Sequence, residues 1–326
     1  MFTMTDSPDP LGVLGSTFAV LNQAKAVRID LDAVDRLADS IARQEVTPPQ
    51  WESQLHWSGE PEATANFILV LDALNFCFWG EPRWMVSYEG KRYNGYLALA
   101  AALTRAMNAG IPLTDASYLT MMDEPTLATI LTGEHTIPLL PQRVANLREA
   151  GNVLLDRYQG QFSGLIRAAN GSAVQLVSRV VHEFPSFNDV AIYEGRRVCF
   201  HKRAQILAAD LFGCFGASGL GAFHDLHQLT AFADYKVPQV LHHFEVLRYA
   251  EDMKNTLTKG LEIPAGDSRE VEIRAATIWG VEALRRALNR RGLVVAPFEI
   301  DWILWQRGQH LPDGVQPYHR TRTIYY

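Results

Sequence analysis

The sequence predicts a mainly α-helical protein with a small β element. Apolar residues recur at helical spacing along most of the chain, whereas strand-like patterns are confined to two short segments. The composition is that of a globular protein, with 48% hydrophobic and 20% charged residues. The 326 residues suffice for one compact helical unit over 1–326, or for two closely packed lobes with seams near 138–141 and 184–189.

The first clear helical pattern covers residues 30–44, which have an acidic first turn and apolar residues at 31, 34, 37, 38 and 41. Such spacing places the apolar side chains on one face of a helix, and acids favour its N-terminus. Similar patterns predict helices at 62–78, 95–109, 114–121, 124–131, 139–157, 160–169, 172–182, 202–214, 222–231, 238–252, 269–290 and 296–307.

The β element is predicted as two hairpins, at 84–93 and 190–200. In each, a short run rich in β-branched and aromatic residues is followed by a Glu-Gly dipeptide and a second short run. Glycine at a two-residue turn favours a tight hairpin. Each hairpin is expected to lead into a helix.

Charge and cysteine content exclude several classes of protein. The formal net charge of −6 argues against broad attraction to nucleic acid, so we expect no stable nucleic-acid complex. Three widely spaced cysteines are typical of reduced core thiols in a cytoplasmic protein. We find no secretory signal and no apolar run long enough for a membrane span.

Metal and cofactor motifs do not emerge from the sequence. Histidines cluster at 224 and 227 and at 242 and 243, but neither an HExxH motif nor paired CxxC motifs accompany them. No dinucleotide-binding fingerprint or P-loop is present either. We therefore predict no metal and no cofactor.

The segment 232–239, Phe-Ala-Asp-Tyr-Lys-Val-Pro-Gln, is the most informative part of the chain. Asp234 lies between the aromatic residues Phe232 and Tyr235. A carboxylate among aromatic groups is costly to bury unless a cation meets it, so Asp234 is a candidate for stabilising positive charge on a substrate. The alternative is an exposed loop acid beside a helix start.

A pair of cations opens the helix predicted after the second hairpin. Lys202 and Arg203 stand in its first turn, where the helix dipole already favours an anion. This placement indicates a phosphate or carboxylate partner, which is either a ligand or an acid of the protein itself.

A third candidate segment lies near the C-terminus. Asp301 stands in an aromatic helix, and Trp302 and Gln306 share a face because they are four residues apart. A carboxylate offers two acceptors that match the N1–H and exocyclic amino group of a guanine-like base. A purely structural acid is the alternative.

Together these segments resemble the queuosine salvage protein family, the queuosine 5′-phosphate N-glycosylases/hydrolases. The matching stretches keep their order and span most of the chain; they are 71–79, 202–206, 232–239, 270–274, 301–302 and 324–326. The resemblance implies a helical fold similar to helix-hairpin-helix DNA glycosylases. It also implies hydrolysis of queuosine 5′-monophosphate, a small-molecule substrate, with release of the 7-deazaguanine base queuine for tRNA modification.

The same resemblance assigns roles to residues of segment 232–235 and to one distant histidine. Asp234 matches the catalytic aspartate and Phe232 its stacking partner, and Ala233 and Tyr235 belong to the same substrate-contacting segment. His56 matches an N-terminal histidine that reaches the base.

The remaining assignments concern the base and the phosphate. Asp301, Trp302 and Gln306 match base-contacting positions, although members of the family can carry Tyr and Asp at the last two. The cations expected to hold the 5′-phosphate are Lys202, Arg203 and Arg196.

Other functional classes stay open at this point. A noncatalytic protein would bind a modified nucleotide without releasing its base. A DNA glycosylase is an enzymatic alternative, against which the net charge and the lack of a basic stripe argue. A helical scaffold with buried ion pairs would bind no ligand.

Overall fold

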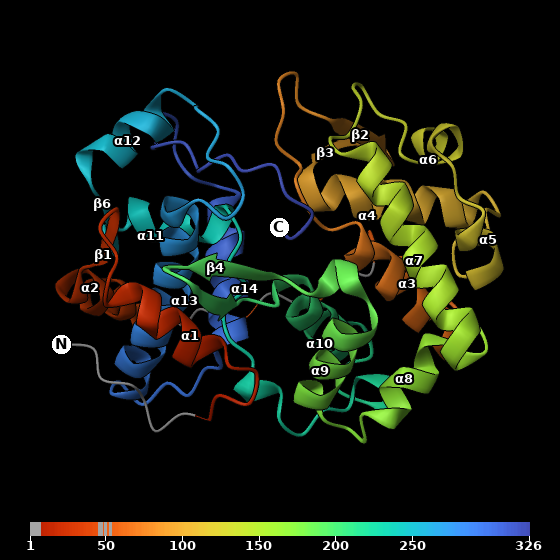
Figure 1. Cartoon of the computed structure of the whole chain (residues 1–326), viewed down its shortest axis with the longest axis horizontal. Coiled ribbons are helices and arrows are strands. Elements are labelled where there is room, and N and C mark those ends of the chain that lie inside the picture. Colours follow the sequence, from red (N-terminus) through yellow and green to blue (C-terminus); the bar gives the residue numbers. More distant parts are fainter. Residues whose placement is uncertain (1–7, 45–47, 49–50, 52–53) are drawn as a thin grey trace. The chain divides into compact units, whose positions relative to one another are not determined.

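The computed structural model describes the chain except residues 1–7, 45–47, 49–50 and 52–53 (Figure 1). Its described part is mainly helical with a few short strands, which confirms the prediction of a mainly α-helical protein with a small β element. The chain forms two compact units. The first unit comprises 1–49, 189–205 and 225–322, and the second comprises 50–188, 206–224 and 323–326. Residues 184–189 lie at a boundary between the units and residues 138–141 lie inside the second.

The elements of the first unit come from three separate parts of the sequence. They are α1 (Val13–Leu21), β1 (Val27–Ile29), α2 (Leu31–Arg43), β4 (Val190–Tyr193), β5 (Arg196–Cys199), η3 (Leu226–Gln228), α11 (Lys236–His243), β6 (Leu247–Tyr249), α12 (Glu251–Thr258), α13 (Ser268–Asn289) and α14 (Pro297–Gly308). Helix α10 (Lys202–Cys214) begins in this unit and continues into the second.

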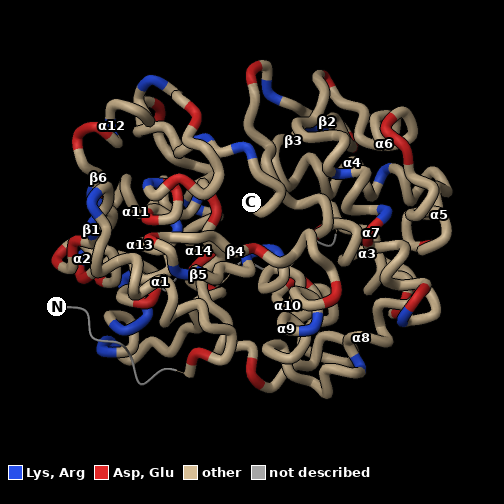
Figure 2. Tube along the Cα trace, in the orientation of Figure 1, with Lys and Arg blue, Asp and Glu red and all other residues tan. Residues whose placement is uncertain are grey.

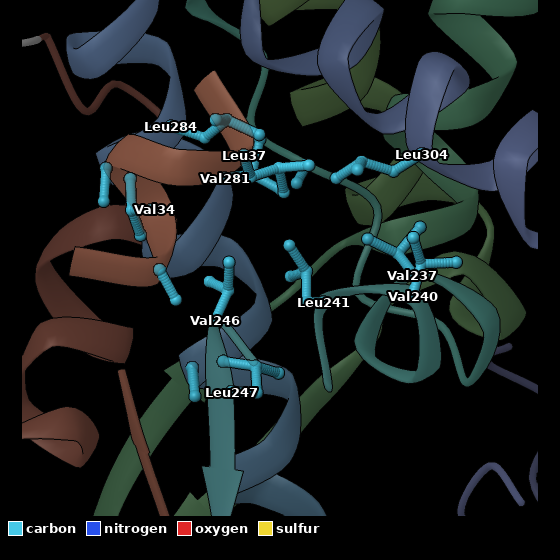
Figure 3. Packing of buried hydrophobic residues seen from close by; sticks show 14 of the residues in the cluster. Val34, Leu37, Val237, Val240, Leu241, Val246, Leu247, Val281, Leu284 and Leu304 are labelled. Carbon is cyan, nitrogen blue, oxygen red and sulfur yellow. The ribbon is translucent and has the colours of Figure 1, made fainter. Parts of the chain in front are cut away.

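Helix α13 is the centre of the first unit. It packs against α1, α2, α11 and α14, and nearly all of its side chains up to Leu284 are buried. Figure 3 shows apolar side chains of α2, α11, β6, α13 and α14 meeting in one core. Burial of each such Val or Leu contributes about 1.5–3 kcal/mol. Gly280 allows close approach here, since a Cβ would lie 3.3 Å from Leu241 Cδ1.

Two antiparallel pairs of strands complete the first unit. Strand β1 pairs with β6, so that Val27 lies opposite Tyr249, and β4 pairs with β5 as the predicted second hairpin. The turn residues Glu194 and Gly195 both have positive φ, 47° and 74°, as a tight hairpin turn requires. The predicted Glu-Gly turn is therefore confirmed here.

The second unit is also helical and carries the first predicted hairpin. Its elements are α3 (Pro61–Ala73), β2 (Met85–Tyr88), β3 (Lys91–Asn94), α4 (Gly95–Asn108), α5 (Ala116–Thr120), α6 (Glu124–Ile130), α7 (Leu140–Tyr158), α8 (Phe162–Ala168), α9 (Ala173–Glu183), η1 (Pro185–Phe187) and η2 (Gly219–Gly221).

Arg143 of α7 holds the segment that follows α3. Its buried guanidinium donates to the backbone carbonyls of Leu74, Phe76 and Cys77. The N–H of Cys77 in turn donates to the carbonyl of the last residue, Tyr326, at 2.9 Å. Two stretches that carry the family resemblance, 71–79 and 324–326, are thus parts of one packed structure.

Three predicted helices are wrong in part. The helix predicted at 62–78 ends at Ala73, and the segment that follows it is held by Arg143. Segment 222–231 forms only the short turn η3, because side chains of Gln205 and Asp301 bind the backbone N–H groups of Thr230 and Phe232. The pattern at 238–252 is divided between α11, β6 and α12, since the chain turns at Glu245 with φ 62° and pairs with β1. Helix α1 and the β1–β6 pair were not predicted. No helix in the described part of the chain is both long and apolar enough to cross a membrane.

Candidate active site

The candidate site lies in the first unit, where a loop leads into α11. Asp234 ends this loop, and its Oδ1 accepts hydrogen bonds from the backbone N–H groups of Lys236 and Val237, each at 2.8 Å. These N–H groups belong to the first turn of the helix, where the dipole favours negative charge. Within the described residues no group donates to Oδ2, and the side chain is partly exposed. The carboxylate is therefore held by one oxygen and presents the other.

Asp301 of α14, far from Asp234 in the sequence, binds the backbone of the same loop. Its Oδ2 accepts a hydrogen bond from the backbone N–H of Phe232 at 2.9 Å, and its side chain is 3% exposed. Helix α14 is fixed at its start by Glu299, whose carboxylate accepts from the N–H of Ala296 at 2.8 Å. Helix α14 thus holds Asp301 against the backbone of the segment that carries Asp234.

Lys202 brings positive charge to both acids. It is the first residue of α10, it is buried, and its charge lowers the pKa of Asp234 and of Asp301. Its backbone N–H donates to Oδ2 of Asp189 at 3.1 Å, which fixes the start of the helix. Three residues far apart in the sequence therefore form one electrostatic cluster.

Burial and mutual repulsion set the protonation of the two acids. The pKa of Asp234 is raised chiefly by burial, against which the charge of Lys202 and the N–H groups at the start of α11 act. The pKa of Asp301 is raised well above its ordinary value, by burial first and by the negative charge of Asp234 second. We conclude that Asp301 holds a proton to higher pH than Asp234 does, because only Asp234 has two N–H donors supporting its anion.

Aromatic residues neighbour the two acids in the sequence and pack within the same unit. Phe232 is buried at 2% exposure. The rings of Tyr235 and Tyr318 are 4.8 Å apart, and Trp302 meets Phe298 edge-on at 5.2 Å. Trp302 stays partly exposed, so it has surface left for a planar ligand.

The other predicted contact residues have varied surroundings. Gln306 is exposed on α14, and Arg196 is exposed at the start of β5. Arg203 is buried at 1% exposure beside Lys202, and Ala233 is buried between Phe232 and Asp234.

His56 belongs to the second unit and has its own network there. Its Nε2 lies 2.9 Å from the hydroxyl of Tyr96, which donates to Asp210 at 3.3 Å. The ring of Trp51 lies 4.1 Å from the His56 ring. His56 is therefore a buried imidazole whose orientation is set by Tyr96 and Trp51.

Sequence reasoning missed the buried pair formed by Arg274 and Asp189. The guanidinium of Arg274 donates to both carboxylate oxygens of Asp189, at 2.9 and 2.5 Å, and to the carbonyl of Ala233 at 3.0 Å. The signal for Arg274 was its place inside the matching stretch 270–274. Asp189 had no comparable signal in the sequence.

No metal-binding group emerges among the residues that the structure describes. No cluster of three or more His, Cys, Asp or Glu side chains there is arranged to hold a metal ion.

Comparison with known proteins gives a consistent result along the chain. The family model for queuosine salvage protein matches residues 55–326. A Sphaerobacter thermophilus protein named queuosine 5′-phosphate N-glycosylase/hydrolase is 59% identical over 323 residues, which cover 99% of this chain and 100% of that protein. Proteins of the same name from Mus musculus and Schizosaccharomyces pombe are 36% and 33% identical. These matches cover 97% and 85% of this chain and 99% and 87% of the relatives.

Proposed function

We propose that this chain, which belongs to the queuosine salvage protein family, hydrolyses the N-glycosidic bond of queuosine 5′-monophosphate and releases queuine. In this reaction the bond between C1′ and the glycosidic nitrogen breaks, and its electron pair goes to the base, which takes up a proton. Water supplies the hydroxyl that bonds to C1′, so the second product is ribose 5-phosphate.

The observation that carries this proposal is the state of Asp234. One oxygen is fixed by two N–H donors at 2.8 Å, while the other accepts no hydrogen bond within the described residues. Such a carboxylate is oriented yet available to stabilise or attack an oxocarbenium-like C1′. Its partly buried surroundings strengthen its field relative to water.

Departure of the base must be assisted by hydrogen bonds to its pyrimidine edge. Position 7 of a 7-deazaguanine is carbon, so protonation at that position cannot assist departure of the base. We assign Asp301 to the N1–H and exocyclic amino group, because its carboxyl is buried and fixed through one oxygen, Oδ2, by Phe232 N–H. Its second oxygen then remains for the base.

The remaining contacts are assigned from the family resemblance and from the charge of the side chains. Phe232 and Trp302 would cover the faces of the base, with Ala233 and Tyr235 completing the wall and Gln306 reaching its edge. For His56, the family resemblance alone supports a contact with the base. Lys202, Arg203 and Arg196 would bind the 5′-phosphate, with Lys202 also supporting the anion of Asp234.

The proposal extends to the setting of the reaction. It includes a fold similar to helix-hairpin-helix DNA glycosylases, a cytoplasmic location and action on a free nucleotide without a stable nucleic-acid complex. The net charge of −6 supports the last point. So does the distribution in Figure 2, where acidic and basic residues are intermixed along the trace.

The test is incubation of the purified protein with queuosine 5′-monophosphate, with free queuine followed by liquid chromatography and mass spectrometry. GMP in a parallel reaction tests recognition of the base, and queuosine without phosphate tests the phosphate contacts. We expect queuine from the nucleotide, less from the nucleoside, and no guanine from GMP. Saturable binding of the nucleotide without any release of base would favour the noncatalytic alternative.

A further inference from the structure

Arg274 of α13 contacts the backbone of the loop that carries Asp234. Its Nε donates to the carbonyl of Ala233, the residue directly before Asp234, at 3.0 Å. One face of the guanidinium lies over the ring of Phe200, 3.8 Å from its centroid. The side chain is 3% exposed, so these contacts are closed to solvent.

Asp189 links the same guanidinium to the start of α10. Its two carboxylate oxygens accept from Nη1 and Nη2 of Arg274 at 2.9 and 2.5 Å. Its Oδ2 also accepts from the backbone N–H of Lys202 at 3.1 Å, and its carbonyl accepts from Phe200 and His201. At 1% exposure, the carboxylate is entirely enclosed by these donors.

A continuous series of contacts therefore connects the loop that carries Asp234 with the start of α10 at Lys202. Asp234 follows Ala233, whose carbonyl binds Arg274, which binds Asp189, which binds the N–H of Lys202. The planar guanidinium can serve one carbonyl and two carboxylate oxygens at once. A lysine ammonium at this place cannot reproduce that geometry.

We propose that Arg274 and Asp189 are positioning residues that hold Asp234 and Lys202 in one fixed arrangement. Neither is assigned contact with the substrate. They act through the backbone at both ends of the contact chain. The inference rests on the proposed function only for its consequence in turnover, because the arrangement itself can be tested without substrate.

The pKa of Asp234 is the readout, because it depends on the charge of Lys202. The groups that act on the Asp234 carboxyl are Lys202 from α10, Lys236 from its own helix and the acid Asp301 from α14. Lys202 lowers the pKa of Asp234, so a loosened start of α10 raises it. Burial and the charge of Arg274 lower the pKa of His319 to about 3.

The experiment measures the pKa of Asp234 in the full-length protein by carbon-13 NMR of aspartate carboxyls, assigned with Asp234→Asn. We expect Arg274→Lys and Asp189→Glu, which both keep the charge at their positions, each to raise it by about 0.5–1 pH unit. Phe200→Leu removes only the ring beneath the guanidinium and should give a smaller rise. The matched control is Arg285→Lys on the same helix, where the arginine binds Glu282 at 2.8 and 2.6 Å, and it should leave the pKa unchanged.

Each outcome of the NMR experiment either supports the positioning role or overturns it. A pKa of Asp234 equal to that of the unsubstituted protein in folded Arg274→Lys and Asp189→Glu would overturn the proposal, as would an equal rise in the control. If both variants fail to fold, Phe200→Leu is the test, and an unchanged pKa of Asp234 in that variant would overturn the proposal. With turnover measured in parallel, the acidic limb of kcat/KM should move to higher pH together with the NMR value. Absence of queuine release from the unsubstituted protein would refute the proposed function and leave the NMR test of positioning intact.

Discussion

Replacing Asp234 by alanine and by asparagine should separate its structural from its chemical role. Alanine removes the acceptor of the two 2.8 Å hydrogen bonds at the start of α11, whereas asparagine keeps a carbonyl oxygen for them. Loss of such a cap costs about 0.5–2 kcal/mol. Both substitutions also remove a charge that burial disfavours and that repels Asp301. We therefore expect Asp234→Asn within about 0.5 kcal/mol of the unsubstituted protein and Asp234→Ala about 1 kcal/mol less stable than Asp234→Asn.

The assay is urea unfolding at pH 7, followed by circular dichroism. Asp123 supplies a calibration, because it caps α6 through the N–H of Thr126 at 2.9 Å, and that hydrogen bond is exposed. Its pKa is lowered by hydrogen bonds from Thr126, so its charge is favourable and Asp123→Asn should destabilise where Asp234→Asn does not. Equal stabilities of Asp234→Ala and Asp234→Asn would refute the capping role. A loss above about 2 kcal/mol in Asp234→Asn would refute the view that burial disfavours the charge.

Two further predictions concern buried charged side chains. The folded protein holds a proton on Asp301 above the ordinary pKa of 3.8, so stability should fall as pH rises from that value through the folded pKa, by up to about 1.4 kcal/mol per pH unit. Asp301→Asn should flatten this decline in thermal unfolding measured from pH 4 to 8, and an unchanged slope would contradict it. Arg143→Met should cost about 2–4 kcal/mol in urea unfolding, since the carbonyls of Leu74 and Phe76 lose their buried donor. The exposed Arg157→Met is its control, and equal losses in both variants would contradict the role of Arg143.

The helical class and the two hairpins could be predicted from local patterns. Glycine-containing turns and apolar residues at helical spacing are properties of neighbouring residues, so they can be recognised without knowledge of the fold. The errors arose where distant groups determine the backbone. Thr230 and Phe232 bind side chains instead of forming a helix, and the short strand β6 exists because β1 is available to pair with it.

The candidate site could be predicted in its residues but not in its arrangement. Asp234, Asp301 and Lys202 were each recognisable as charges in unusual surroundings, yet only the fold brings their charges together. Asp189 could not be recognised, because its importance lies in contacts with Arg274 and the backbone of Lys202. Such positioning contacts depend on tertiary structure and leave no local pattern.

The measurement that tests the central claim most directly is base release from queuosine 5′-monophosphate by the unsubstituted protein and by Asp234→Asn. Nucleotide binding to each protein is measured by calorimetry under the same conditions. We predict that Asp234→Asn binds the nucleotide and releases queuine at least about 1,000-fold more slowly, because the amide cannot stabilise or attack the cation at C1′. Queuine release at a near-normal rate by Asp234→Asn would contradict the assignment of Asp234 as the catalytic residue.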